Sequence, residues 1–269
     1  LLQAKKLTKI LKSEETNFKV FIAMRYWKPF VSTTIQKVKK WGPKEIILLP
    51  LYPQYSTTTT ESSINSWKKE VKKASYFVPT KIICCYPKHA KFISAHVTNI
   101  KKIFLKINNL RNTIVLFSAH GLPEKIIKQG DPYQFQIELT ANKIIDKLNN
   151  NNCEYKISYQ SKVGPLKWIG PSTEEEIVKA SKIYKNIIVV PVAFVSEHSE
   201  TLVELDIEYK NMAKDYGCEN YYRVPALGIN KEFLESLKDL ILIKSKGPIL
   251  NENICSNSRK KCFYNNRNL

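Results

Sequence analysis

The chain has 269 residues, of which 43% are apolar and 25% charged, and it carries a formal net charge of +19. This balance is typical of folded globular proteins and argues against a disordered or fibrous chain, while the length suits one large domain or two of ordinary size. No run of about 18 apolar residues occurs, which argues against a membrane span. Six cysteines without a C-x-x-C pair argue against a disulfide framework or a zinc site and favour a reducing cytoplasm.

The excess of lysine raises nucleic acid as a partner, because clustered basic side chains bind phosphate. The lysines are instead scattered among isoleucine and asparagine residues, as at Lys5, Lys6 and Lys9. A compositional bias explains this pattern better than a binding stripe. We therefore expect no nucleic-acid partner.

Short β-branched runs alternate along the chain with longer helical patterns. Such alternation is typical of βα repeats and of a parallel sheet covered on both faces. Strands are predicted at 18–24, 45–51, 81–85, 113–118, 155–159, 186–190 and 221–224. Helices are predicted at 30–41, 60–75, 88–107, 132–149, 173–183, 199–214 and 230–244, and a helical pattern also opens the chain. The predicted fold class is α/β throughout.

A polar stretch at 106–113 divides this pattern into two halves. We expect an N-terminal lobe at 1–110, a C-terminal lobe at 111–248 and a frayed polar tail at 249–269, each lobe with its own sheet. Ligands of open α/β sheets bind at the carboxyl ends of the strands. The loops after the strands should therefore hold the chemistry.

One of these loops, Ser-Ala-His-Gly-Leu-Pro at 118–123, follows the predicted strand 113–118. Gly121 and Pro123 shape a tight turn there, which places His120 to point into a cleft. A histidine that is hydrogen-bonded within its own loop explains the residue equally well. Position alone leaves both interpretations open.

A second loop continues from the strand 186–190 into a helix with a row of carboxylates. At 100° per residue, Glu197, Glu200, Glu204 and Glu208 fall within about 80° of one another. Like charges at i and i+4 cost an isolated helix about 0.2–0.5 kcal/mol per pair, so the row favours a metal ion or protons as neutralising partners. A solvated face offset by lysines is the alternative. The row's start at the end of a buried-looking strand favours a functional role.

Two further loops, 23–29 and 50–56, combine aromatic and basic side chains. Arg25, Tyr26 and Tyr52 could sandwich a flat anionic ligand by stacking and ion pairing. Such residues also fill cores, so this signal is weak by itself. A long loop at 159–171 has many turn-forming residues and one tryptophan, Trp168.

Taken together, these segments resemble ferrochelatases, the enzymes that insert ferrous iron into a porphyrin, over nearly the whole chain. The matching stretches are MRYWKPF, PLYPQYS, LFSAHGLP, GDPY, YQSKVGPLKWIGP and PVAFVSEHSETLVELDIEY, which begin at residues 24, 50, 116, 130, 159 and 191. The resemblance implies two similar Rossmann-like lobes, each a four-stranded parallel sheet flanked by helices, with the active-site cleft between them.

The resemblance also implies roles for individual residues. His120 and Glu200 would be catalytic and would bind the ferrous ion, with Glu200 across the cleft from His120. Substrate contacts are implied at Arg25, Tyr26, Tyr52, His198 and Glu204. Iron must displace two N–H protons from the ring, and a neutral imidazole and carboxylates can accept protons or hold metal. No redox cofactor is needed.

Some ferrochelatases carry a two-iron cluster bound by four cysteines, three near the C-terminus and one in the YPQYS loop. Here that loop continues Ser56-Thr57-Thr58, and the tail offers only Cys255 and Cys262. We therefore expect no iron–sulfur cluster. Family members also begin with a strand, an NLGGPD-type loop and a flexible lip, none of which precedes Leu1, so we expect the N-terminal lobe to lack these parts.

The resemblance implies protoporphyrin IX and ferrous iron as the substrates. It also implies a cytoplasmic location, with peripheral contact to the inner membrane left open and the oligomeric state not indicated. Two alternatives remain: coproporphyrin III as the substrate, and a non-catalytic remnant that binds porphyrin or metal. The activity of the chain without the family's N-terminal segment is likewise open.

Overall fold

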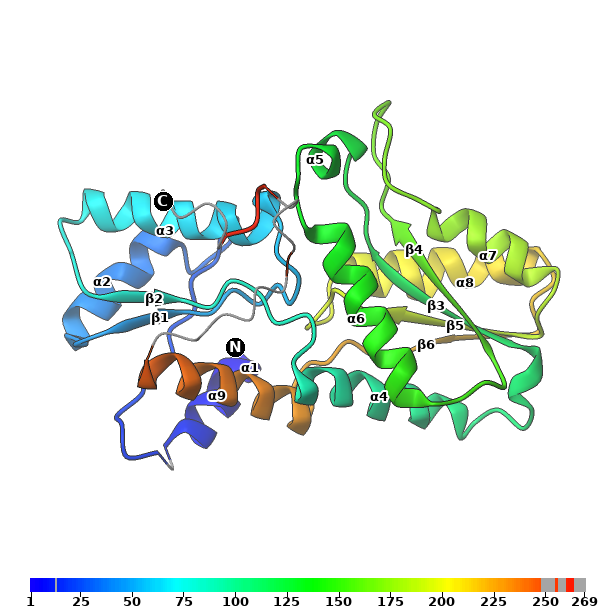
Figure 1. Ribbon diagram of the computed structural model, residues 1–269, viewed down its shortest axis with the longest axis horizontal. Helices are drawn as coiled ribbons and strands as arrows, with labels where there is room; N and C mark the ends of the chain where they lie inside the picture. The colour runs from blue at the N-terminus through cyan, green and yellow to red at the C-terminus, as the bar shows by residue number, and fades with distance from the viewer. Residues whose placement is uncertain (13, 248–254, 256–259, 264–269) are drawn as a thin grey trace.

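The computed structural model describes residues 1–12, 14–247, 255 and 260–263. Two lobes lie side by side, each with its own parallel sheet (Figure 1). The larger sheet has the strand order β4-β3-β5-β6 and consists of β3 (Thr113–His120), β4 (Glu154–Gln160), β5 (Asn186–Pro191) and β6 (Asn220–Arg223). The smaller sheet pairs β1 (Ile46–Leu48) with β2 (Thr80–Ile82). The predicted α/β class is confirmed.

Every predicted helical stretch contains a helix. The α-helices are α1 (Leu2–Leu11), α2 (Val31–Trp41), α3 (Ser62–Lys73), α4 (Ala90–Phe104), α5 (Glu124–Lys128), α6 (Tyr133–Leu148), α7 (Thr173–Ser181), α8 (Tyr209–Asp215) and α9 (Lys231–Lys246). A short 3₁₀ turn, η2, spans Leu110–Asn112, and two π-helical segments are η1 (Thr57–Glu61) and η3 (Glu200–Glu208). The predicted helix 199–214 is therefore a π-helix that continues into the α-helix α8.

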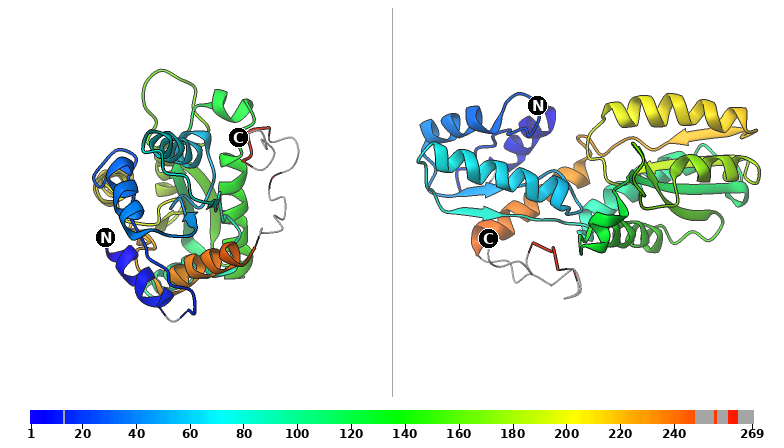
Figure 2. Two further views of the ribbon diagram at one scale, coloured as in Figure 1. Left: turned by 90° about the vertical axis from the view of Figure 1, so that its left-hand side faces the viewer. Right: turned by 90° about the horizontal axis from the view of Figure 1, so that it is seen from above.

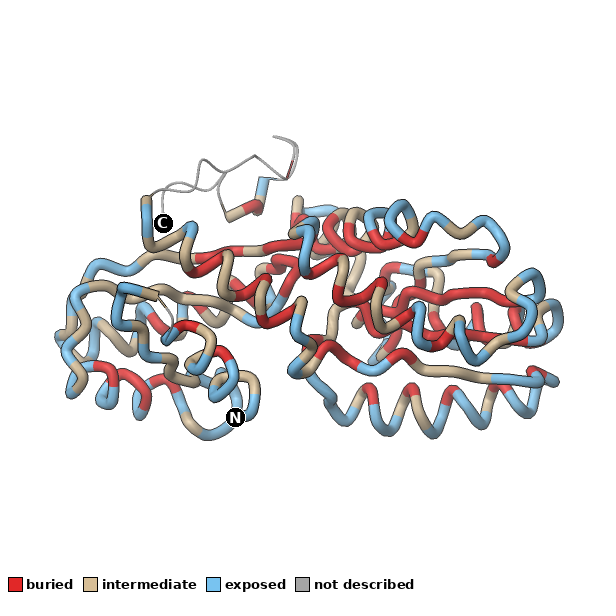
Figure 3. The backbone as a smooth tube through the Cα atoms, turned by 90° about the horizontal axis from the view of Figure 1, so that it is seen from below, coloured by how far each residue is buried: buried red, intermediate tan, exposed pale blue. Residues whose placement is uncertain are grey.

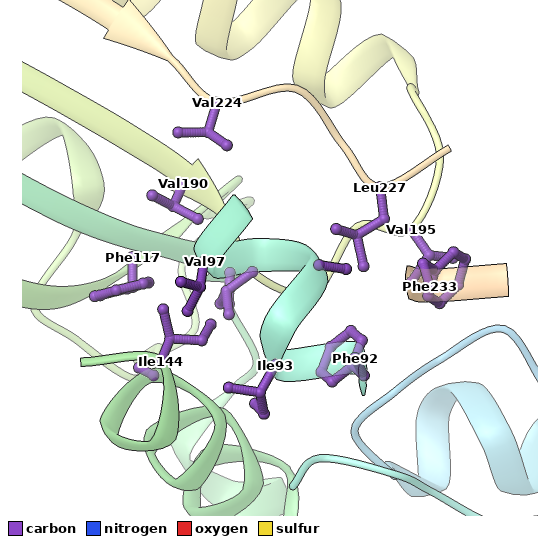
Figure 4. Close-up of a cluster of buried hydrophobic side chains, with 14 of the residues drawn as sticks. Phe92, Ile93, Val97, Phe117, Ile144, Val190, Val195, Val224, Leu227 and Phe233 are labelled. Carbon is purple, nitrogen blue, oxygen red and sulfur yellow. The ribbon is translucent and has the colours of Figure 1, made fainter. Parts of the chain in front are cut away.

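Strands β3 and β5 are buried along almost their whole length, as expected for apolar runs in a parallel sheet. Their side chains alternate between two cores. Val115 and Phe117 face the helices α4 and α6, where Figure 4 shows Phe117 beside Val97 and Ile144. Ile114 and Leu116 face α7, α8 and η3 on the other side. The larger sheet is thus the rigid layer from which the loops at its carboxyl end project, and Figure 3 shows buried residues concentrated along it.

The predicted boundary at residue 110 separates the two sheets but not their helices. Helix α4, predicted in the N-terminal lobe, packs against α6 on the larger sheet, and α9, predicted in the C-terminal lobe, packs against α1, β1 and β2. Helices α2 and α3 cover the opposite face of the smaller sheet (Figure 2). A helix from each half of the sequence therefore packs with the sheet of the other half, and one continuous core joins the two lobes.

The predicted strand 18–24 is wrong, and in the described residues the smaller sheet has two strands rather than the expected four. Residues 18–23 form no strand, and Met24 makes only an isolated bridge to Phe30. The side chains of Phe18, Val20 and Phe21 still pack on the cores, which explains the apolar pattern. A strand requires a neighbouring strand with which to exchange hydrogen bonds, and none adjoins this segment among the described residues.

Most of the predicted tail, 249–269, lies outside the described residues. Its described positions are anchored rather than frayed. The Lys261 N–H donates to Gly130 O at 3.2 Å, and the Phe263 ring lies 6.3 Å from the Tyr55 ring, centroid to centroid. Cys255 and Cys262 are buried.

Candidate active site

A cleft of ≈ 1870 Å³ is lined by residues of both lobes. One wall comes from the carboxyl end of the larger sheet and includes His120, Tyr133, His198 and Glu200. The facing residues come from the segment 18–27 and the loop after β1. The volume exceeds the roughly 300–1,000 Å³ typical of drug-sized ligands, so a large planar ligand has room.

His120 is the last residue of β3, and its side chain is 39% exposed. The ring Nδ1 lies 2.7 Å from Gly121 O, and because a carbonyl can only accept, Nδ1 carries the proton. In the neutral imidazole, Nε2 is therefore left with a free lone pair. That nitrogen lies 3.9 Å from Glu200 Oε2. His120 therefore lines the cleft and is also hydrogen-bonded within its own loop.

Glu200 opens the π-helix η3, in the chain that leaves β5. Because β5 is the hydrogen-bonded neighbour of β3, the two strand ends bring Glu200 and His120 together on one wall. The expectation that Glu200 faces His120 from across the cleft is wrong. His198 joins the pair, with its Nδ1 3.7 Å from Glu200 Oε1.

The predicted row of four carboxylates is not a single open face. Hydrogen bonds in a π-helix join i to i+5, so positions four apart no longer stack as they do in an α-helix. Arg223 holds Glu197 through two bonds of 2.8 and 2.9 Å and also pairs with Asp206. Burial opposes the charge of Arg223, but these carboxylates outweigh it and raise the pKa of the guanidinium.

Glu204 is not a lining residue of the cleft. Its carboxylate accepts hydrogen bonds from Gln160, Ser161 and Tyr209. The structure therefore separates Glu204 from the other residues for which a substrate contact was expected. Of the four carboxylates in the row, only Glu200 lines the cleft.

Arg25, Tyr26 and Tyr52, from the two aromatic loops, all line the cleft. The Arg25 guanidinium lies 4.7 Å from the centre of the Tyr26 ring, and its Nε donates to Ser62 Oγ at 3.1 Å. Tyr26 is 75% exposed. These groups offer an aromatic face and a positive charge opposite the polar wall.

Sequence reasoning assigned no role to two aromatic residues that support His120. The Tyr133 hydroxyl donates to His120 O at 3.0 Å, and burial raises the pKa of Tyr133, which keeps it a neutral donor. The Trp168 ring centroid lies 6.2 Å from the imidazole. A Cβ at Gly121 would stand 3.0 Å from the Trp168 ring and 3.1 Å from Gln160 O, so this close approach favours glycine. In the sequence, Tyr133 belongs to the GDPY match and Trp168 to the KWIGP part of another match, so these motifs could have indicated both residues.

The structure also brings the adjacent Cys84 and Cys85 close to Cys255 and Cys262, which lie more than 160 residues later in the sequence. Cys84 Sγ lies 3.1 Å from Cys85 Sγ, and the Gln136 amide donates to Cys85 and Cys255. The pKa of Cys85 is raised first by its hydrogen bond with Cys84 and then by burial. The pKa of Cys255 is raised in the same way, by its hydrogen bond with Cys262 and by burial. Within the described residues, no group of three or more His, Cys, Asp or Glu side chains has a geometry that could hold a metal ion.

Comparison with known proteins decides the family. The Ferrochelatase family profile matches residues 2–245. The chain belongs to the ferrochelatase family. It is 52% identical over 262 residues to the ferrochelatase of Pelagibacter ubique, covering 95% of this chain and 75% of that protein. It is 49% identical over 272 residues to the ferrochelatase of Rickettsia typhi, covering 97% and 75%.

Solved structures share the ferrochelatase-family fold of this chain at low identity. SirB from Bacillus subtilis with Fe³⁺ superposes with a TM-score of 0.64 at 14% identity, covering 97% of this chain and 91% of SirB. CbiX, described as the terminal enzyme for biosynthesis of sirohaem in denitrifying bacteria, gives 0.57 at 12% identity, covering 89% and 88%. At such identities the likeness shows the fold alone.

Proposed function

We propose that the chain inserts ferrous iron into protoporphyrin IX to form protohaem, the last step of haem synthesis. One observation carries the proposal beyond family membership: the free Nε2 of His120 lies 3.9 Å from the Glu200 carboxylate in a cleft that both lobes line. Insertion replaces two pyrrole protons by Fe²⁺, so the site must accept two protons. An imidazole lone pair beside a carboxylate supplies two acceptors.

In this mechanism His120 Nε2 accepts a pyrrole proton, while the Nδ1–H bond to Gly121 O fixes the ring orientation. Glu200 then stabilises the imidazolium through its carboxylate or takes the second proton itself. His198, 3.7 Å from Glu200 and more than half exposed, leads from this pair toward solvent. His120 and Glu200 are also the proposed ligands of the incoming ferrous ion, and the single Nε2 lone pair of His120 holds either the metal or the proton, not both at once.

The porphyrin would lie between the polar wall and the aromatic loops. Tyr52 and Tyr26 present ring faces, and Arg25 offers a positive charge for a propionate. Coproporphyrin III, with four propionates, remains the alternative substrate. A second candidate function, a non-catalytic porphyrin- or metal-binding remnant, would keep the cleft without turnover.

An anaerobic insertion assay separates these candidates. Purified protein is mixed with ferrous iron and either porphyrin, and loss of porphyrin fluorescence is followed against a protein-free control. We expect enzyme-dependent loss with protoporphyrin IX, at a higher kcat/KM than with coproporphyrin III. Faster reaction of coproporphyrin III would reassign the substrate. Tight porphyrin binding without insertion would favour the remnant.

No helix in the described part of the chain is long and apolar enough to cross a membrane. Peripheral contact remains part of the proposal, together with a cytoplasmic location. The net positive charge is concentrated in the first part of the chain, because residues 1–110 hold 21 lysines and arginines but only 5 acidic residues. Beside Lys28, Tyr26 and Trp27 are 75% and 74% exposed. Exposed aromatic and basic groups together suit an anionic membrane surface.

Co-sedimentation with vesicles of mixed neutral and anionic lipid tests this contact. We expect binding that falls with salt and is weakened by Trp27→Ala. Equal retention on neutral vesicles, or none on either, would contradict it. Duplex DNA serves as a competitor, and we expect no complex with DNA at physiological salt.

A further inference from the structure

Glu204 is bound on all sides by hydrogen-bond donors. Its Oε1 accepts from the Ser161 N–H at 2.9 Å and from the Tyr209 hydroxyl at 2.6 Å. Its Oε2 accepts from the Gln160 amide at 3.1 Å and from the Ser161 hydroxyl at 2.6 Å. Four donors use the lone pairs of the carboxylate, which leaves it poorly placed to bind a metal ion or a porphyrin.

These donors belong to the strand beside His120. In the parallel pairing of β3 with β4, Gln160 is the register partner of His120. The Gln160 side chain accepts from Ser118 Oγ at 2.7 Å, and its backbone carbonyl accepts from the Gly121 N–H at 2.8 Å. Gln160 is therefore hydrogen-bonded to Ser118 before His120 and to Gly121 after it, while its side-chain amide donates to Glu204.

Ser161 shows that Glu204 maintains a particular backbone conformation. Its φ is +62°, in the left-handed region that non-glycine residues rarely adopt. Both polar groups of Ser161 that point toward Glu204 are satisfied by that carboxylate. A conformation of this kind persists only where surrounding contacts hold it.

The other end of the connection is the helix that carries Glu200. Glu204 lies four residues beyond Glu200 in η3, and the hydroxyl of the buried Tyr209, where α8 begins, donates to its carboxylate. Burial and the Glu204 hydrogen bond raise the pKa of Tyr209, so the phenol stays a donor. We propose that Glu204 is a positioning residue, which locks η3 to the β4 end and so sets the separation of Glu200 from His120. This inference rests on the proposed function, because the His120–Glu200 separation matters only if the pair takes part in iron insertion.

Glu204→Gln tests the proposal. The Gln amide has nearly the same shape as the carboxylate, but its N–H₂ group is itself a donor and cannot accept hydrogen bonds from the four surrounding donors. We expect kcat for iron insertion to fall about tenfold or more, because small displacements of reacting groups cost this much. KM for iron and for porphyrin should change by less than about twofold, since Glu204 touches neither substrate. Glu208→Gln, an exposed carboxylate on the same helix, is the matched control and should behave as the wild type.

A second substitution distinguishes positioning from a direct role. Glycine adopts positive φ without cost, so Ser161→Gly should restore part of kcat to the Glu204→Gln protein and change the wild type little. A carboxylate that bound iron or relayed protons could not be replaced in this way. Normal turnover of Glu204→Gln, or a loss that Ser161→Gly does not relieve, would overturn the proposal.

A crystal structure of Glu204→Gln keeps the test independent of activity. We expect Ser161 to leave positive φ and Glu200 to move away from His120, with the larger sheet unchanged. An unchanged Ser161 and an unchanged His120–Glu200 distance would refute the positioning role. If the wild-type protein inserts no iron, the proposed function fails, and this structural comparison alone decides the role of Glu204.

Discussion

Nε2 of His120 lies 3.9 Å from Oε2 of Glu200, although the two residues belong to different βα units. Adjacent parallel strands explain the encounter, since β3 ends at His120 and β5 leads to Glu200. The pair sits on one wall of the cleft. The opposite side is then free for the aromatic loops and the flat substrate.

Glu200→Gln is expected to lower kcat about 100-fold or more, because the amide keeps the size of the side chain but cannot accept a proton. Porphyrin affinity, measured by quenching of protein fluorescence, should change by less than about threefold. Glu174→Gln, an exposed position on α7, is the control. Full activity in Glu200→Gln would remove Glu200 from the proton path.

Asp131 joins the two lobes and is fully buried. Its carboxylate accepts from the Ser56 hydroxyl, from the Thr57 N–H and hydroxyl, and from the Tyr133 N–H. Asp131→Ala leaves these buried donors without partners and should lower the free energy of unfolding by about 3 kcal/mol or more.

Urea denaturation measures that loss. Asp146→Ala on α6 is the matched control, because Asp146 is largely exposed and, among the described residues, pairs with Lys143 alone, and it should change stability by less than about 0.5 kcal/mol. Equal small effects of both substitutions would show that the junction between the lobes does not depend on Asp131.

His96 should make the protein sensitive to acid. Burial lowers the pKa of His96 to about 3, and among the described residues its Nε2 has no hydrogen-bond partner. Below pH 6.5 the unfolded chain binds a proton there that the folded protein cannot, so stability present above pH 6.5 is lost as the pH falls toward 3.

His96→Leu removes this titration. Between pH 7 and pH 4 the wild type should lose up to about 3 kcal/mol more unfolding free energy than the variant, at 1.36 kcal/mol per pH unit. Parallel stability curves over this range would mean that His96 is hydrated or protonated in the folded state.

The purified protein is predicted to lack the visible absorbance of an iron–sulfur cluster. Cys85 and Cys255 are held as neutral thiols by hydrogen bonds and burial, and Gln136 lies between them. Iron and acid-labile sulfide are measured after anaerobic purification. Stoichiometric sulfide that disappears in Cys85→Ser would show that the gathered thiols rearrange around a cluster.

The sequence predicted those parts of the fold that depend on local pattern. The apolar run of β3 is buried on both faces, as its composition indicated, and the loop after it carries His120. Residues 18–24 have the same kind of pattern, but strand formation also depends on a neighbour, which a local pattern does not reveal.

Long-range partners account for the remaining differences at the candidate site. A helical wheel placed Glu204 beside Glu200, whereas the π-helical hydrogen bonds of η3 and the donors from Gln160 and Ser161 give it another environment. Cys85 and Cys255 likewise come together only through tertiary packing. The resemblance of motifs indicated residues that line the cleft, but not the hydrogen bonds that hold the site in place.

The most direct test of the account is single-turnover insertion of ferrous iron into protoporphyrin IX by the wild type and His120→Ala, followed anaerobically by fluorescence. The imidazole is part-exposed, so its removal should leave the melting temperature nearly unchanged, while His89→Gln, outside the cleft-lining residues, controls for loss of a histidine. We predict insertion by the wild type and by His89→Gln, and a loss of at least about 100-fold in His120→Ala. Insertion by His120→Ala at the wild-type rate would contradict the assignment of this site.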